Sequence, residues 1–144
     1  QSGGYYTTLY VPDNVSESTY NTLLIEPSVV HTLEKIKQAN ITIHGIGDAL
    51  KMAHRRQSSD EVIERLQHHQ AVGEAFGYYF DAQGQIVHKV KTIGLQLEDL
   101  ENKDFIFAVA GGQSKGEAIK AYLSIAPENT VLITDEAAAK VILQ

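Results

Sequence analysis

The chain has 144 residues, of which 43% are hydrophobic and 21% charged, a length and composition typical of one folded domain. It has no cysteine, which excludes disulfides, thiolate catalysis and cysteine-ligated zinc and fits a cytoplasmic protein. Eighteen acidic and twelve basic residues give a net charge of −6, whereas nucleic-acid-binding domains usually carry a basic excess. No apolar run approaches the ~18 residues of a membrane-spanning helix, and no secretory signal is visible.

Strand-like and helical patterns alternate along the N-terminal part of the sequence. Tyr5–Val11 is rich in aromatic and β-branched residues and predicts a strand that ends at a Pro-Asp-Asn turn. Ser16–Leu24 is compatible with a short helix, and Pro27–Ala39 predicts an amphipathic helix with proline in its first turn. Ile41–Ile46 predicts a short buried strand, and Asp48–Arg56 predicts a helical turn or two.

The middle of the chain predicts a helix followed by a β-hairpin. Ser58 and Glu61 have the spacing of a capping box, which opens a helix over Asp60–His69. The inward face of this helix consists of Val62, Ile63 and Leu66. Gly73–Phe80 is aromatic-rich and predicts an extended segment, and Gln85–Val90 predicts the strand that returns after a turn.

The C-terminal part predicts a β-α-β-α unit. Asp104–Ala110 is the clearest buried strand, and Ser114–Leu123 predicts the helix after it. Thr130–Thr134 and Glu136–Leu143 predict a second strand and a last helix. A crossover helix between neighbouring strands indicates parallel pairing. The fold class is therefore α/β, with a Rossmann-like, largely parallel sheet, flanking helices and a β-hairpin.

Ligands of open α/β sheets bind beyond the carboxyl ends of the strands. Glycines follow two of the predicted strands, at Gly45 and Gly47 and again at Gly111 and Gly112. Glycine lets a ligand approach backbone N–H groups, and a helix N-terminus favours an anion. These four glycines are therefore candidate ligand-binding residues.

Three catalytic or nucleotide motifs are incomplete in this sequence. Gly112–Gly116 matches the nucleophile elbow G-x-S-x-G, and Asp135 has the place of the triad acid, but no histidine follows Ser114. Glu117 stands where a phosphate-binding loop needs lysine, and Leu50 stands where a dinucleotide fingerprint needs its third glycine. Ser114 with Glu117 instead predicts a capping box, and we assign no catalytic residue.

Several cations lie near the predicted strand ends. Lys115 stands in the first turn of a helix, where a cation opposes the helix dipole and therefore favours an anionic partner. Lys51 and Arg55 are four residues apart and share one helix face, from which Arg56 points away. The alternative is that these side chains form a solvated basic face.

Glu74 lies within an aromatic-rich segment, where a carboxylate can accept hydrogen bonds from sugar hydroxyls and a neighbouring ring can pack on the sugar. The alternative is an edge-strand charge that discourages aggregation. His44, in the middle of a predicted strand, is expected to be a packed histidine. No histidine pair has the spacing of a helical metal site, so we predict no metal.

Four segments together resemble the effector-binding domain of SorC-type bacterial transcriptional regulators. They are HGIGDALKMAHRR (44–56), GEAFGYYFDAQGQIVHKV (73–90), AVAGGQSKGEAIKAY (108–122) and NTVLITDEAAAKVIL (129–143). The resemblance implies a fold related to ribose-phosphate isomerase and glucosamine-phosphate deaminase. It implies a phosphorylated sugar as effector, above all fructose 1,6-bisphosphate, with no cofactor. Arg55 and Lys115 would then contact phosphate oxygens, and Glu74 would contact sugar hydroxyls.

The resemblance also implies that residues 1–144 are the C-terminal part of a single effector-binding domain. The first part of that domain and the winged helix-turn-helix domain that contacts DNA would lie outside these residues. We then expect weaker bisphosphate binding, and apolar surface that is exposed or paired with another chain, as in a homo-oligomer. No membrane partner is expected.

Two other classes of function share these features. A sugar-phosphate isomerase or deaminase on the same fold would use Glu74 or Asp48 as its base. A pure oligomerisation module would retain the cleft without a ligand. We favour a sensor, not an enzyme, in which the ligand biases the regulator between states of different DNA affinity.

Overall fold

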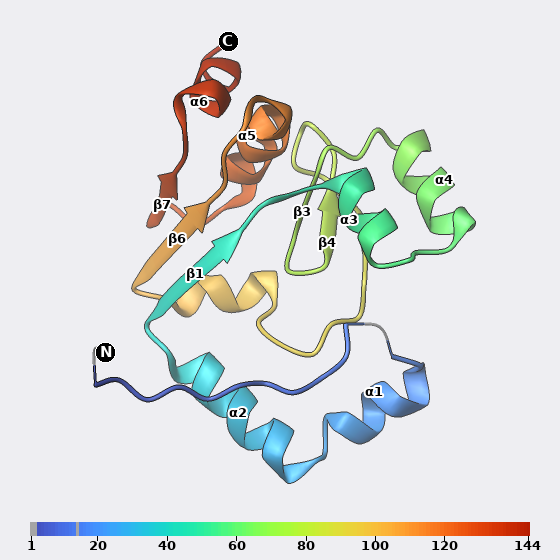
Figure 1. The fold of residues 1–144 in the computed structure, drawn as a ribbon, viewed down its shortest axis with the longest axis vertical. Coiled ribbons are helices and arrows are strands. Elements are labelled where there is room, and N and C mark those ends of the chain that lie inside the picture. Colours follow the sequence, from blue (N-terminus) through green and yellow to red (C-terminus); the bar gives the residue numbers. More distant parts are fainter. Residues whose placement is uncertain (1–2, 14) are drawn as a thin grey trace.

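The computed structural model describes residues 3–13 and 15–144, which form two sheets flanked by helices (Figure 1). A parallel sheet has the strand order β1-β6-β7, with β1 at Ile41–Gly45, β6 at Phe105–Val109 and β7 at Thr130–Ile133. An antiparallel sheet has the order β2-β3-β4-β5. Its strands are Gly47–Asp48, Gly73–Ala75, Tyr78–Phe80 and Ile86–Lys89. The predicted α/β class, parallel unit and hairpin are confirmed.

The helices follow the predicted order. They are α1 (Glu17–Leu23), α2 (Pro27–Gln38), α3 (Ala49–Arg55), α4 (Asp60–His68), α5 (Gly116–Ile125) and α6 (Glu136–Ile142), with 3₁₀ turns η1 (Leu97–Asn102) and η2 (Gln113–Lys115). No helix among the described residues combines the length and apolar character needed to cross a bilayer.

The buried side chains form two clusters. The first is shared by both sheets: Ala108 of β6 is buried with Ile119 and Tyr122 of α5 and with Ala75 and Phe80 of the antiparallel sheet. The antiparallel sheet packs on α3 and α4. The second cluster consists of Tyr79, Leu66, Ala49 and Ala53, with Val62 and Ile63 partly buried against them. The predicted inward face of α4 is therefore confirmed.

The predicted strand at Tyr5–Val11 is wrong. This segment makes no ladder with any described strand, and Tyr5, Tyr6 and Tyr10 are almost fully exposed. The composition favours an extended backbone, but a strand also needs a neighbouring strand to bond its N–H and C=O groups.

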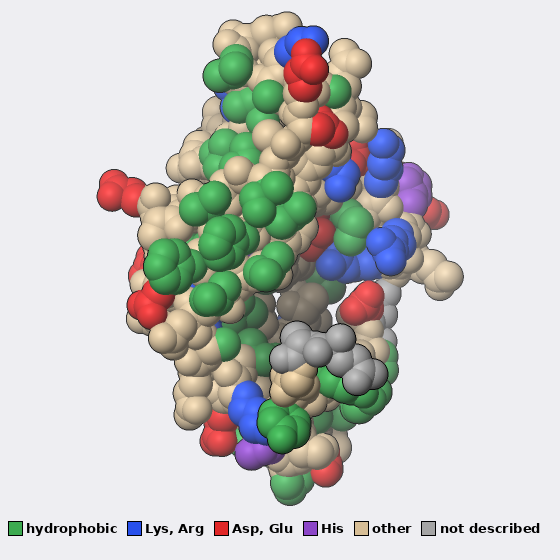
Figure 2. Space-filling view, turned by 60° about the vertical axis from the view of Figure 1, so that its left-hand side comes forward, with side chains coloured by type: hydrophobic (Ala, Val, Ile, Leu, Met, Phe, Trp, Pro, Cys, Tyr) green, Lys and Arg blue, Asp and Glu red, His purple; other side chains and the backbone are tan. Residues whose placement is uncertain are grey.

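The opposite side of the parallel sheet is open and apolar, so β1 and β6, which the sequence predicts as buried strands, are buried on one face only. Side chains alternate along each strand, and the outward set is exposed, with Ile43 at 73%. The space-filling view shows these side chains as one continuous hydrophobic surface (Figure 2). We call it the open sheet face; its exposed members are Ile41, Ile43, Phe105, Val109, Val131 and Ile133. Parallel sheets normally have both faces covered.

Three local predictions differ from the structure. Ser59, not Ser58, caps α4, and its Oγ accepts a hydrogen bond from the Val62 N–H. Ser114 does not cap α5, because η2 intervenes and the N-cap is Lys115. The segment 73–80 folds back on itself because Phe76 and Gly77 both have positive φ, the geometry of a tight hairpin turn.

Candidate functional site

The two predicted glycine turns are neighbours at the carboxyl end of the parallel sheet. The parallel register places Gly45 beside Val109, and strand β2, which begins at Gly47, lies against η2, which follows Gly112. The crossover topology brings them together, because carboxyl ends of parallel strands share one edge. Their contact with a ligand stays a prediction.

Lys115 ends η2 and is partly buried. It lines a pocket of about 360 Å³ together with Val109, Ala110, Gly111, Ile133 and Thr134. Within residues 3–13 and 15–144, Lys115 forms no salt bridge with an acidic side chain. Neither Arg55 nor Glu74 lines this pocket.

Asp135 already occupies part of the second glycine turn. Its Oδ2 accepts a hydrogen bond of 2.7 Å from the Gly112 N–H, and its Oδ1 accepts one of 2.8 Å from the Ala138 N–H at the start of α6. A Cβ at Gly111 would lie 2.5 Å from Oδ2, so a side chain there would displace this carboxylate. A phosphate at this turn must therefore rely on Lys115 more than on the Gly112 N–H.

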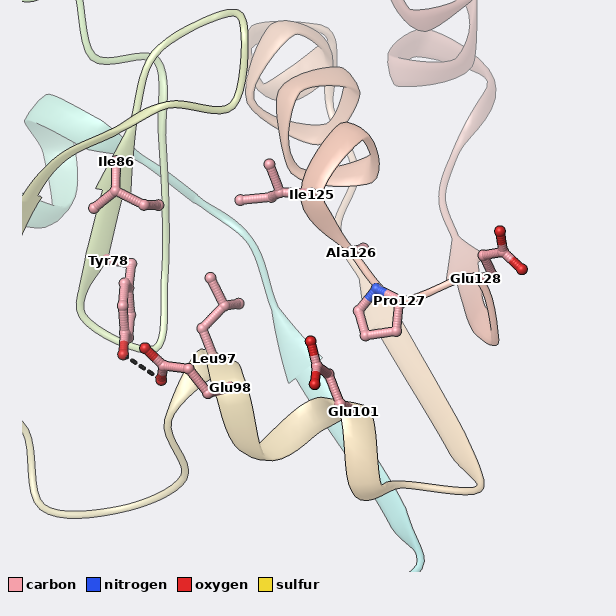
Figure 3. A pocket seen from close by; sticks show the side chains of 9 residues that line it. All are labelled: Tyr78, Ile86, Leu97, Glu98, Glu101, Ile125, Ala126, Pro127 and Glu128. Atoms are coloured by element: carbon pink, nitrogen blue, oxygen red, sulfur yellow. Dashed lines mark hydrogen bonds between the residues drawn. The ribbon is translucent and has the colours of Figure 1, made fainter.

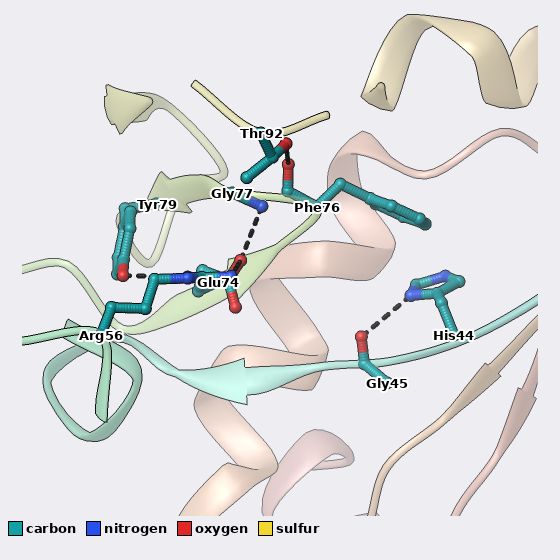
Figure 4. Close-up of polar contacts among 8 residues, drawn as sticks. All are labelled: His44, Gly45, Arg56, Glu74, Phe76, Gly77, Tyr79 and Thr92. Carbon is teal, nitrogen blue, oxygen red and sulfur yellow. Dashed lines mark hydrogen bonds and ion pairs between the residues drawn. The ribbon is translucent and has the colours of Figure 1, made fainter. Parts of the chain in front are cut away.

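Glu74, on β3, is buried with 4% of its surface exposed. Its Oε1 accepts a hydrogen bond of 2.6 Å from the Gly77 N–H and lies 3.1 Å from Nη2 of Arg56 (Figure 4). Arg56 also donates from Nη1 to the Tyr79 hydroxyl at 3.1 Å. Burial opposes the charge of Arg56, but the Tyr79 hydrogen bond and the Glu74 charge outweigh it, so the pKa of Arg56 is raised. Arg56 therefore keeps its positive charge beside Glu74.

The two arginines at the end of α3 lie differently with respect to Glu74. Arg55 ends α3 and is exposed, and no hydrogen bond or ion pair joins it to Glu74 in the described chain. Arg56, which we expected to point away, is the cation beside Glu74. Arg56 keeps a helical conformation, and its N–H donates to the Met52 carbonyl. It follows Ala53 by three residues and Met52 by four, so it lies on the buried face of α3, away from the face of Lys51 and Arg55. The phosphate role of Arg55 stays a prediction.

His44 is the packed histidine that the sequence predicts. Its ring lies 4.5 Å from that of Phe76 and 5.0 Å from that of Tyr122. The Gly45 carbonyl accepts from Nδ1 at 2.9 Å, which leaves Nε2 to accept from the Tyr122 hydroxyl at 2.8 Å. Burial lowers the pKa of His44 and raises that of Tyr122 to about 12, so both groups are neutral at pH 7.

A second pocket, of about 440 Å³, lies between η1, the hairpin and the end of α5 (Figure 3). Its lining includes Glu98, Glu101 and Glu128. The Tyr78 hydroxyl donates to Glu98 at 2.6 Å, and this bond lowers the pKa of Glu98. Carboxylates repel phosphate, so this pocket is a poor site for a phosphorylated ligand. No group of three or more metal-binding side chains occurs in the part of the chain described.

Comparison with known proteins identifies the family. The sugar-binding domain family matches residues 1–144. The central glycolytic genes regulator of Priestia megaterium is 50% identical over 97% of this chain, and that of Bacillus subtilis is 48% identical over 100% of it. The chain spans only 41% and 42% of the length of these two relatives. A SorC family transcriptional regulator from Enterococcus faecalis has a TM-score of 0.92 at 50% identity, over 99% of this chain and 57% of that one. The chain thus belongs to the sugar-binding domain family found in SorC-type regulators.

Proposed function

We propose that this chain is the effector-binding part of a bacterial transcriptional regulator of glycolytic genes and that it binds a phosphorylated sugar, with fructose 1,6-bisphosphate as the first candidate. The carrying observation is the juxtaposition of two glycine turns, one beside Glu74 and the other beside Lys115. The relatives named as regulators of central glycolytic genes support the same assignment.

In this proposal, Arg55 and Lys115 bind phosphate oxygens by charge-assisted hydrogen bonds, and Glu74 accepts from sugar hydroxyls. The four glycines at 45, 47, 111 and 112 let the ligand approach the backbone. The ligand acts in the cytoplasm without a cofactor and shifts the regulator between states in proportion to its differential affinity for them. DNA is contacted by a domain outside residues 1–144.

Removing either phosphate-binding cation should weaken effector binding. We expect Arg55→Ala and Lys115→Ala each to weaken binding of fructose 1,6-bisphosphate by about 1–3 kcal/mol, the usual worth of hydrogen bonds to a charged group. Isothermal titration calorimetry measures the change. Lys120→Ala, which removes an exposed cation from α5, is the matched control and should bind as the unaltered chain does. Unchanged affinity in both test variants would refute the assignment.

An isomerase or deaminase remains the alternative, with Glu74 or Asp48 as base. The structure favours binding over proton transfer, because both carboxylates already accept backbone hydrogen bonds. Glu74 accepts from Gly77, and Asp48 Oδ1 accepts from the Lys51 N–H at 2.9 Å as the N-cap of α3. Incubation with sugar phosphates, followed by NMR, decides the matter: a new sugar product would establish the enzyme.

We also infer that the chain forms homo-oligomers through the open sheet face, because a parallel sheet is stable when both faces are covered. Ile43→Lys places a charge in this face, and desolvating it should weaken self-association about tenfold or more. Light scattering across a concentration series measures this. Ile25→Lys, at a residue 78% exposed between α1 and α2, is the control. A monomer at every concentration of the unaltered chain would overturn the inference.

A further inference from the structure

The two oxygens of the Glu74 carboxylate have different surroundings. Oε1 is engaged by Arg56 and by the Gly77 N–H. Oε2 lies on the side of Gly47, 3.4 Å from where a Cβ on that glycine would be, and the Met52 side chain lies against the same point. Gly47 is paired directly with Glu74 in the antiparallel ladder. The second oxygen is therefore directed at the first glycine turn, where the proposed ligand lies.

Arg56 and Gly77 contact this carboxylate directly, and Tyr79 contacts it indirectly, through Arg56. Arg56 comes from the end of α3, Gly77 from the turn after β3, and Tyr79 from β4, where its hydroxyl fixes the other nitrogen of the same guanidinium (Figure 4). Tyr79 is fully buried, so the hydroxyl has little freedom to move. Arginine thus connects Glu74 to a rigid part of the core.

We propose that Arg56 is a positioning residue for sugar recognition: it holds Oε1 of Glu74 so that Oε2 faces the sugar hydroxyls at Gly47. This inference rests on the proposed function and adds a residue to it. Arg56 does not contact the ligand, so it governs selectivity for the sugar and leaves phosphate attraction to other cations. The planar guanidinium is needed because its two nitrogens reach Tyr79 and Glu74 simultaneously, a geometry that the single ammonium of lysine lacks.

The test compares two neighbouring tyrosines. Tyr79→Phe removes the hydroxyl that fixes Arg56 and leaves all charges in place. Tyr78→Phe, the control, removes a buried tyrosine's hydroxyl from the same strand, but that hydroxyl bonds Glu98 at the acidic pocket. Arg56→Lys is the stronger variant, and Tyr79→Phe keeps the test informative if that lysine variant folds poorly. NMR titration measures binding of fructose 1,6-bisphosphate and of inorganic phosphate.

We expect Tyr79→Phe to weaken fructose 1,6-bisphosphate binding about threefold and Arg56→Lys about tenfold, the equivalents of about 0.7 and 1.4 kcal/mol. Inorganic phosphate should bind all variants as it binds the unaltered chain, whereas a merely structural defect would weaken both ligands. A loss of phosphate affinity in Arg56→Lys would make Arg56 a phosphate ligand and overturn the positioning role. Equal behaviour of Tyr79→Phe and Tyr78→Phe would overturn it while leaving the proposed function intact. Failure of the unaltered chain to bind the bisphosphate would overturn both.

Discussion

Glu74→Leu should lower the free energy of unfolding by about 3–5 kcal/mol, the usual loss when one partner of a buried ion pair is removed. The reason is the environment of Arg56, whose side chain is mostly buried and would keep its charge without the carboxylate at 3.1 Å. Urea denaturation followed by circular dichroism measures the loss.

The double variant Arg56→Met/Glu74→Leu provides the decisive comparison. If the loss in Glu74→Leu comes from the stranded guanidinium, removing that charge as well should recover much of the stability, because two apolar side chains can replace a buried pair at little cost. Glu61→Leu is the matched control. It breaks the exposed pair Glu61–Arg65 on α4, and should cost less than about 1 kcal/mol.

Two outcomes would contradict this view of the pair. A loss in Glu74→Leu no larger than that in Glu61→Leu would show that the buried carboxylate contributes little to stability. Equal losses in the double variant and in Glu74→Leu would show that the stranded charge is not the cause, and would assign the effect to the Gly77 N–H that Glu74 also accepts.

The sequence predicts the elements whose signal is local. Pro27 and the apolar stripe after it define α2, and the β-α-β order at the C-terminal end defines the parallel sheet, both as observed. Prediction from the sequence fails where a neighbouring segment determines whether a strand is paired or a sheet face is covered. Tyr5–Val11 has strand composition without a strand beside it, and one face of β1 and β6 stays open although the side chains on that face are apolar. Composition reports what a segment prefers, but not whether another segment covers it.

The candidate site also has one feature that the sequence predicts and one that it does not. The proximity of the two glycine turns follows from topology, and so was predictable. The partnership of Arg56 with Glu74 was not predicted, because eighteen positions separate them and only the packing of α3 against β3 brings them together. The available signal is that Arg56 follows Met52 and Ala53 at helical spacing and so continues the apolar face of α3.

Lys103 provides the second large effect on stability. It is 3% exposed, and its Nζ donates to the carbonyls of Ile36, Lys37 and Ala39 at 2.7–2.9 Å, where α2 ends. These carbonyls have no partner within the helix, and they carry the negative end of its dipole. A single ammonium therefore both caps α2 and holds it against the start of β6.

Lys103→Met keeps the length of the side chain and removes its donors, so we expect a loss of about 2–3 kcal/mol in unfolding free energy. Lys37→Met is the control, because Lys37 is exposed in the last turn of the same helix. It should lower the free energy of unfolding by only a few tenths of the loss in Lys103→Met. Hydrogen exchange locates the effect: the amides of α2 should lose protection more than those of α5, because the cap joins only α2 to the sheet. Similar losses in the two variants would instead mean that the general attraction of a cation to the helix end, and not the buried cap, supplies the stability.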